Sequence, residues 1–273
     1  MSTPYKAEIH RFNGEVETCE MGMNEAALLV RDRKAAAVLL DVVDPADLDK
    51  WWNDDAFPEV TQHQSFRGAA KSGLAIGPTQ RLVKDKLIPG LIDYFSYAGK
   101  CNGGLRETEF VKLCVRELGA DAVRVGDWGE LPLVSKREYT PNPDSEYSVP
   151  PHCDAIHFGR EPQNWPIKEG YEEGHDQISI FLSIKDSENV AGLTMWDVRP
   201  ASRAELDELM AEYIETGRIR RLNNAPTVTA RPKPGVIAVL NTRVMHAVEQ
   251  CVSVRQTLGS FVVWHDGQWR IFH

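Results

Sequence analysis

The chain has 273 residues, of which 42% are hydrophobic and 26% charged, and its formal net charge at pH 7 is −9. This composition is ordinary for a soluble globular protein, and the acidic balance argues against a nucleic-acid partner, which would require a basic surface. The longest apolar run, at residues 34–43, is too short to cross a bilayer, so no membrane span is expected. The five cysteines form no C-x-x-C pair and no signal peptide is seen, which predicts reduced thiols and a cytoplasmic protein.

The first 125 residues predict a mixture of strand and helices. The run AAAVLLDVV at residues 35–43 has the apolar character of a buried strand. A short helix is expected next, because Asp44 is a good N-cap residue and a proline follows it. Helical spacing is also found at residues 88–99 and 105–120, and the latter segment reaches a C-capping glycine at Gly119.

From Leu131 onward the chain changes to short β-like runs separated by Pro, Gly, Asn and Asp. One helix interrupts these runs at residues 202–217, where Ser202 and Glu205 form a capping box and Gly217 ends the helix. About eight strands are predicted, at residues 131–140, 147–158, 176–186, 191–198, 226–232, 235–243, 244–254 and 255–265.

Eight short strands of this kind are typical of a double-sheet jelly roll or a barrel. We therefore predict a mainly β fold of the α+β type. Its jelly-roll core would occupy residues 126–273, and the helices of residues 1–125 would pack on one outer face. No internal repeat or low-complexity linker divides the sequence, so a single domain over residues 1–273 is expected.

The segment YSVPPHCDAIHFG suggests a metal site. On a strand, the side chains of His152 and Asp154 would point to the same face, and Cys153 would point away and pack. An H-x-D sequence alone is weak, because a capped turn or a surface pair also explains it. Its interpretation therefore depends on what else the chain can bring to the same place.

Two further residues strengthen the metal interpretation. His246 is expected in the middle of a predicted strand with apolar neighbours, although a hydrogen-bonded core histidine would fit that setting too. Arg255 opens another apolar strand without an obvious acidic partner, and a buried arginine is costly unless an anion pairs with it. Two histidines and one carboxylate on one side of a metal leave the opposite side open, as in non-haem Fe(II) oxygenases.

The combination of His152, Asp154, His246, Arg255 and Thr257 resembles the signature of the Fe(II)/2-oxoglutarate-dependent dioxygenases. The resemblance covers residues 131–265 and implies a double-stranded β-helix, which is a jelly-roll fold. It implies that the two histidines and the aspartate bind Fe(II). Arg255 and Thr257, helped by Tyr139, would bind the cosubstrate 2-oxoglutarate. Thr257 stands where serine is common in the family, and it keeps the hydroxyl group.

Two other histidines compete for the place of the third ligand. His157 is at i+5 from His152, so it would face the other side of a regular strand, and His175 opens a strand after a glycine-containing turn. Surface or substrate-facing roles suit both histidines better. His246 is therefore the predicted third ligand.

The resemblance also implies the reaction. 2-Oxoglutarate and O₂ would be converted to succinate and CO₂ while an unactivated C–H bond of a small molecule is hydroxylated. Related halogenases have glycine or alanine in place of Asp154, so hydroxylation is the default expectation here, with desaturation and ring formation as open alternatives. An amino acid or an amino-acid derivative is the expected substrate, and the oligomeric state is left open.

Several alternatives remain at this stage. The segment at residues 160–175 would line the pocket or form a plain solvated loop. Arg137, Arg199 and Arg243 could bind a substrate carboxylate, although surface salt bridges are the simpler interpretation. The alternative function is a cupin-like metal-binding sensor, or a dioxygenase that needs no 2-oxoglutarate. Arg255 discriminates between these alternatives, because an enzyme without that cosubstrate has no need of it.

Overall fold

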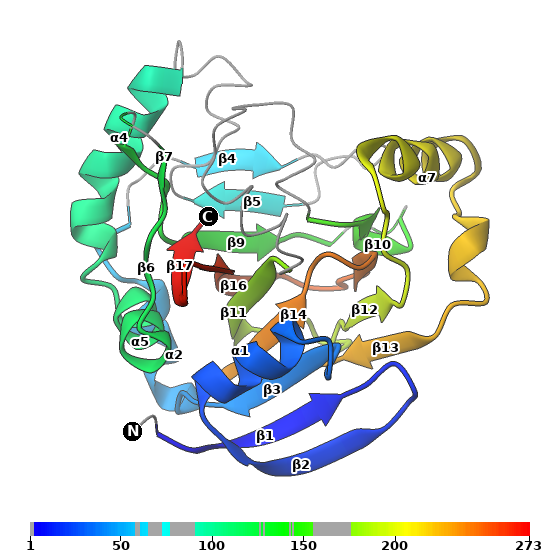
Figure 1. Cartoon of the computed structure of the whole chain (residues 1–273), viewed down its shortest axis with the longest axis horizontal. Helices are drawn as coiled ribbons and strands as arrows, with labels where there is room; N and C mark the ends of the chain where they lie inside the picture. The colour runs from blue at the N-terminus through cyan, green and yellow to red at the C-terminus, as the bar shows by residue number, and fades with distance from the viewer. Residues whose placement is uncertain are drawn as a thin grey trace.

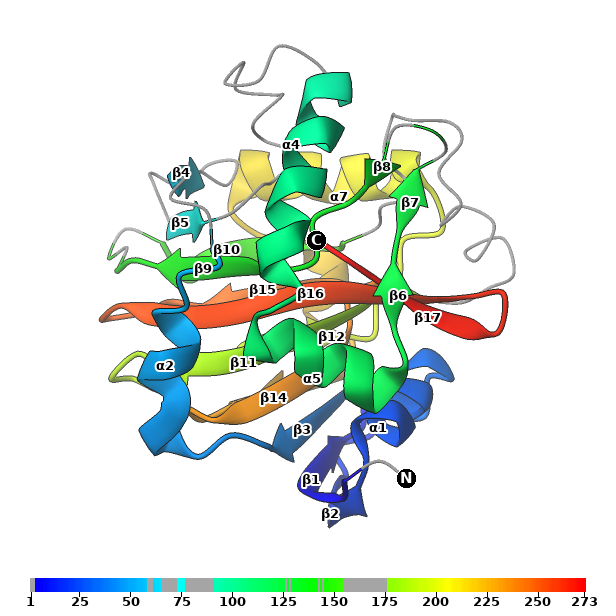
Figure 2. The same ribbon diagram turned by 90° about the vertical axis from the view of Figure 1, so that its left-hand side faces the viewer.

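The structure is a computed structural model that describes residues 3–57, 61–64, 73–76, 91–125, 127, 129–141, 143, 145–154 and 176–273. Two sheets face each other, and helices cover the outer side of the larger one (Figures 1 and 2). The predicted loop at residues 160–175 lies outside the described residues, and so do His157 and His175.

The larger sheet has eleven strands, and most of its neighbours are far apart in the sequence. Its main path runs β2-β1-β3-β14-β11-β16-β9-β5-β4, and β17 extends it by pairing with the second half of β16 and with the short β6. The strands of this sheet are β1 (Tyr5–His10), β2 (Val16–Met21), β3 (Ala37–Asp41), β4 (Thr61–Gln64), β5 (Gly73–Ile76), β6 (Asp121–Ala122), β9 (Ser135–Tyr139), β11 (Ile178–Lys185), β14 (Val236–Asn241), β16 (Arg255–His265) and β17 (Gln268–Phe272).

The smaller sheet has four strands in the order β10-β15-β12-β13. They are β10 (Tyr147–His152), β15 (His246–Glu249), β12 (Leu193–Trp196) and β13 (Thr227–Ala230). All of its pairings are antiparallel, and a register shift interrupts the β10–β15 pair just before His152. A separate two-stranded ribbon joins β7 (Arg124–Val125) to β8 (Gly129–Glu130).

The two faces of the larger sheet serve different purposes, because successive side chains on a strand alternate between them. On the outer face, residues such as Val38, Ile180 and Val239 pack against helices in the largest hydrophobic cluster. On the inner face, residues such as Phe181 and Leu240 meet the smaller sheet in a second cluster. Figure 2 shows the helices in front of the outer face. They are α1 (Met23–Arg31), α2 (Leu48–Trp52), α4 (Leu91–Leu105) and α5 (Glu109–Leu118).

The helix ends follow the predicted capping residues. Asp44 caps the 3₁₀ turn Pro45–Asp47 that leads into α2, and Gly119 ends α5 with a φ of 63°. Helix α7 (Arg203–Thr216), in the right-hand part of Figure 1, is capped by Ser202 and ends at Gly217. A second 3₁₀ turn, Arg220–Leu222, follows it.

The predicted fold class, a jelly-roll core with N-terminal helices on one face, is confirmed. The structure adds strands that the sequence patterns did not indicate, above all β1, β2 and β17. Residues 1–125 thus contribute several strands to the larger sheet as well as helices. The single-domain boundary at residues 1–273 stays a prediction. Among the described residues, no helix has both the length and the apolar character needed to cross a bilayer.

Candidate active site

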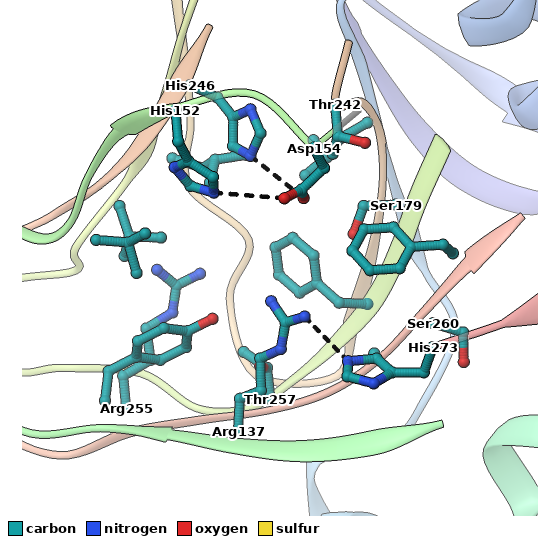
Figure 3. Close-up of a pocket in the computed structure, with 18 residues that line it drawn as sticks. Arg137, His152, Asp154, Ser179, Thr242, His246, Arg255, Thr257, Ser260 and His273 are labelled. Carbon is teal, nitrogen blue, oxygen red and sulfur yellow. Dashed lines mark hydrogen bonds and ion pairs between the residues drawn. The ribbon is translucent and has the colours of Figure 1, made fainter. Parts of the chain in front are cut away.

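A cavity of about 170 Å³ lies between the two sheets, and all of the predicted site residues line it. Figure 3 shows the charged and polar side chains converging on it from both sheets. The lining residues are Arg137, Tyr139, Val149, His152, Asp154, Ser179, Phe181, Leu193, Leu240, Thr242, His246, Val248, Arg255, Thr257, Gly259, Ser260, Phe261 and His273.

The two histidines are brought together by direct pairing of their strands. His152 is the last residue of β10 and His246 the first residue of β15, and they are register partners. Their ring centroids are 4.2 Å apart. The prediction that His246 lies in the middle of a strand is wrong: a turn at residues 242–244 precedes it, so the residue opens the strand. At this first position of the strand, the ring of His246 faces the cavity.

Asp154 completes the cluster from just beyond the end of β10. Its backbone N–H donates to the carbonyl of Thr242, which fixes the chain at this point. One carboxylate oxygen is 3.7 Å from Nε2 of His152, and the other is 3.7 Å from Nε2 of His246. One ligand atom from each of the three residues lies within 4.8 Å of the others. Cys153 points away and packs beside Trp196 and Met245, as predicted.

Backbone carbonyls set the orientation of both imidazoles. Nδ1 of His152 is 2.8 Å from the carbonyl oxygen of Pro150, and Nδ1 of His246 is 3.0 Å from that of Val244. A carbonyl oxygen only accepts, so Nδ1 must carry the proton in both rings. Each Nε2 then has its lone pair toward Asp154, which is the arrangement that a metal requires.

The electrostatics of the cluster favour the ligand forms of His152 and Asp154. Burial lowers the pKa of His152 to about 4, and the neighbouring His246 adds to the shift while Asp154 opposes it. Burial alone would raise the pKa of Asp154, but the neighbouring His246 and His152 and the positive charge of Arg137 together lower it. Neutral imidazole and ionised carboxylate are the forms that bind metal ions.

Arg255 is 1% exposed and is among the largest fully buried side chains of the described residues. One of its terminal nitrogens donates to the carbonyl of Ala191 at 3.2 Å, and its Nε has no hydrogen-bond partner among the described residues. Asp186 is close enough to be influenced by this charge, but burial raises the pKa of that carboxyl and no ion pair forms between the two within the described residues. These contacts are consistent with the prediction that Arg255 pairs with an anion from a bound ligand.

Tyr139 and Thr257 lie on either side of this arginine. Tyr139 is the direct register partner of Arg255 across the β9–β16 pair, and the guanidinium carbon is 5.8 Å from the centroid of its ring. Thr257 is two residues along β16, so its hydroxyl is on the same face as Arg255. Tyr139 is 7% exposed and Thr257 is 3% exposed.

Arg137, His273 and Ser135 lie at or beside the cavity and were not among the predicted site residues. Arg137, for which a surface salt bridge was the simpler interpretation and a substrate carboxylate the alternative, lines the cavity. His273 lines it from just beyond the end of β17. Ser135 holds the His273 ring, with 2.6 Å between Oγ and Nε2. Arg137 is two residues from Tyr139 on β9, so the alternation of a strand could have placed it there. His273 had no such signal, because its position depends on the pairing of β17 with β16.

The other two arginines considered from the sequence do not line the cavity. Arg199 makes two hydrogen bonds with the buried Asp176, so the expected salt bridge exists, but one partner is in the interior. Arg243 is half-buried, and its backbone N–H donates to Asn241.

The donor set fits a first-row divalent metal such as Fe(II). Two imidazole nitrogens and a carboxylate oxygen converge on one point, and the hydrogen bonds at both Nδ1 atoms supply the usual outer support. The buried Arg255 nearby, with a nitrogen still lacking a partner, fits the distant carboxylate of a bound dicarboxylate. Together the fold and the site fit a jelly roll of the oxygenase type with one metal ion.

Comparisons with known proteins identify the family. The N-substituted L-amino acid dioxygenase of Burkholderia ambifaria AMMD is 32% identical, and its structure matches with a TM-score of 0.80 over 100% of both chains. A structure of that dioxygenase with α-ketoglutarate, which is 2-oxoglutarate, matches with a TM-score of 0.78 and 33% identity over 100% of both chains. No protein-family model matches the chain, and no curated protein matches its sequence. The chain belongs to the Fe(II)/2-oxoglutarate-dependent dioxygenases, and Fe(II), 2-oxoglutarate and O₂ are its cofactor and cosubstrates.

Proposed function

We propose that this enzyme hydroxylates an unactivated C–H bond of an N-substituted L-amino acid. The observation that carries the proposal is the match, over the whole length of both chains, to a dioxygenase whose name specifies that substrate class. The retained carboxylate of Asp154 supports hydroxylation over halogenation, because it occupies the position that a halide would need. The substrate is thus a small molecule. A cytoplasmic location is part of the proposal and is supported by five free cysteines.

We assign His152, Asp154 and His246 as the residues that hold Fe(II). The support is their convergence to within 4.8 Å and the backbone hydrogen bonds that turn both Nε2 atoms inward. Three protein ligands on one side leave the other positions for the cosubstrate and O₂. When bound, Fe(II) supplies the oxidation of 2-oxoglutarate to succinate and CO₂ that is coupled to hydroxylation of the substrate.

We assign Arg255, Thr257 and Tyr139 to 2-oxoglutarate. Arg255 would pair with the carboxylate that is distant from the metal, through the charge-assisted, fork-like geometry that a guanidinium offers. Thr257 would donate its hydroxyl to the same group, and Tyr139 would close the subsite with its ring against Arg255. The burial of all three side chains keeps water away from this pairing and so strengthens it.

The apolar part of the lining has its own role. Val149, Phe181, Leu193 and Leu240 come from both sheets and surround the polar groups. They would exclude water from the reacting carbon and give the hydrocarbon part of the substrate an apolar surface. Such a surface suits a side chain whose unactivated C–H bond is to be oxidised.

A substrate screen tests the proposal. Purified enzyme with Fe(II), 2-oxoglutarate and air would be incubated with a panel of N-acetyl and N-methyl L-amino acids and with the free amino acids, with succinate as the readout. We expect N-substituted compounds to give succinate above the background without substrate, and mass spectrometry to find one added oxygen. Free amino acids turned over faster than all N-substituted ones would contradict the substrate class. No succinate with any compound would contradict the activity.

A further inference from the structure

Arg137 is a second arginine in the cavity, and the roles assigned above do not use it. It lies on β9 directly opposite Thr257, two residues from Tyr139, so it shares the inner face of the larger sheet with the 2-oxoglutarate residues. Figure 3 shows its side chain directed toward Asp154, and its charge acts on both Asp154 and His152. It is therefore placed beside the metal site.

Among the described residues, the guanidinium of Arg137 has one hydrogen-bond partner, which it meets through one terminal nitrogen. One terminal nitrogen is 2.9 Å from Nε2 of His273, and that ring nitrogen is also 2.6 Å from the hydroxyl of Ser135. Arginine can only donate, so Nε2 of His273 accepts and the ring is neutral with its proton on Nδ1. Burial and the charge of Arg137 both lower the pKa of His273, which agrees with a neutral ring. Nε of Arg137 is buried and has no hydrogen-bond partner among the described residues.

The charged groups of the described lining do not balance without another anion. Its described lining has two guanidinium groups, Arg137 and Arg255, and one carboxylate, Asp154. Fe(II) brings two positive charges and 2-oxoglutarate two negative ones, so these cancel. Arg255 is matched to 2-oxoglutarate, and no carboxylate of the described residues forms an ion pair with Arg137. One positive charge is left over on the half-buried Arg137, whose Nε is buried, and an uncompensated charge in such a place is costly.

We propose that Arg137 binds the carboxylate of the amino-acid substrate and that His273 is its positioning residue. This inference rests on the proposed function and adds the group that recognises the substrate. Substitution of the amine by an acyl group removes the ammonium charge, so an N-acyl amino acid with a neutral side chain carries only its carboxylate. Its single negative charge equals the charge that the cavity lacks. The guanidinium nitrogens of Arg137 that have no hydrogen-bond partner among the described residues can donate side by side, which suits a planar carboxylate better than a single oxygen atom.

Binding experiments with matched acids and amides test the proposal. N-acetyl L-amino acids and their primary amides would be titrated calorimetrically into the anaerobic Fe(II)·2-oxoglutarate enzyme. We expect the acids to bind at least roughly tenfold more tightly than the amides in wild type. Loss of one member of a desolvated charge pair costs roughly tenfold or more, so Arg137→Gln should weaken acid binding by that factor and remove the preference over amides. Acids that bind no better than amides in wild type would overturn the proposal.

A control variant and a second readout separate this proposal from the proposed function. Arg220→Gln removes the same charge from an exposed surface site and should leave acid binding unchanged. Arg137→Gln should keep the visible absorption band that Fe(II) and 2-oxoglutarate form together, with an unchanged 2-oxoglutarate midpoint. If wild type formed no such band, the proposed function would fail. If the band formed and Arg137→Gln bound acids as wild type does, only the present inference would fail.

The role of His273 has its own test. His273→Phe removes the acceptor from Arg137, whereas His273→Gln offers an amide oxygen in its place. We expect His273→Phe to raise KM for an N-acetyl amino acid several-fold more than it lowers kcat, and His273→Gln to restore most of the loss. Equal effects of the two variants, with no change in the acid-over-amide preference, would show that His273 only supports the fold.

Discussion

His152 and His246 are direct partners across two antiparallel strands, and their rings are 4.2 Å apart although 94 residues separate them in the sequence. The strand pairing fixes the distance between the two backbones, and the carbonyls of Pro150 and Val244 fix the rotation of the rings. The proposed metal site is therefore preorganised by the sheet. Fe(II) would meet ligands that already face one another.

The first prediction concerns metal binding. His246→Ala or His152→Ala should weaken Fe(II) binding by more than about 100-fold, because even the loss of an outer-shell partner typically costs 10–100-fold. Metal content after anaerobic loading and desalting measures this directly. A chelator should remove the metal from wild type and abolish succinate formation, and added Fe(II) should restore it. His265→Ala, which changes a histidine outside the cavity, is the control. Full metal content in His246→Ala with loss in His175→Ala would show that the third ligand is wrongly assigned.

The second prediction concerns Asp154. Asp154→Asn keeps the shape of the side chain but removes the charge that faces both imidazoles. We expect weaker metal binding and a fall in substrate-dependent succinate formation of at least roughly 100-fold. Asp154→Gly should lose hydroxylation as well, and it is not expected to gain efficient halogenation, which also requires a binding site for the halide. Near-normal hydroxylation by Asp154→Asn would contradict the ligand role.

The third prediction concerns the cosubstrate. Arg255→Ala should reduce 2-oxoglutarate affinity by roughly 30-fold to several-thousand-fold, since truncating one partner of a buried charge pair costs about 2–5 kcal/mol. Arg255→Lys should fall between wild type and Arg255→Ala, because a point charge cannot reproduce the guanidinium fork. Titration of 2-oxoglutarate into the anaerobic Fe(II) protein gives the midpoints.

Metal content serves as the internal control for this experiment and should change little in either Arg255 variant. Arg220→Ala, an exposed arginine, should titrate as wild type does. An unchanged midpoint in a folded Arg255→Ala protein would contradict the assignment of Arg255 to 2-oxoglutarate. It would favour the alternative of an enzyme that does not use 2-oxoglutarate at this site.

The fourth prediction concerns stability. Asp176 is 2% exposed, accepts from both Arg199 and Asn241, and is 3.4 Å from Arg33. Asp176→Ala would leave these donors without their acceptor, so we expect a loss of about 2–4 kcal/mol in the free energy of unfolding. Urea denaturation measures it. The matched control is Glu17→Ala, which breaks the exposed pair with Arg11 and should cost less than about 1 kcal/mol. A similar small loss in Asp176→Ala would show that the buried pair is not stabilising.

The sequence by itself determined the chemistry of the candidate site. H-x-D at the end of a β-like run, a histidine among apolar residues and an arginine without an acidic neighbour are local patterns. Their residue types restrict what they can bind. The jelly-roll core was also predictable. The alternation of apolar and polar residues along the strands, and the helix caps at Ser202 and Gly217, depend only on short stretches of sequence.

Only the tertiary structure decided which residues share the cavity. β1, β2 and β17 are stabilised by long-range pairing, so their short sequences give no sufficient signal of their own. His246 was placed in mid-strand although a turn brings it to the strand's first position. Of the two interpretations of Arg137, a surface salt bridge or a ligand of the substrate carboxylate, the pairing of β9 with β16 favours the second, because it places the residue at the cavity. His273 reaches Arg137 because β17 folds back on β16. Contacts between residues far apart in sequence arise from sheet register, which no local pattern specifies.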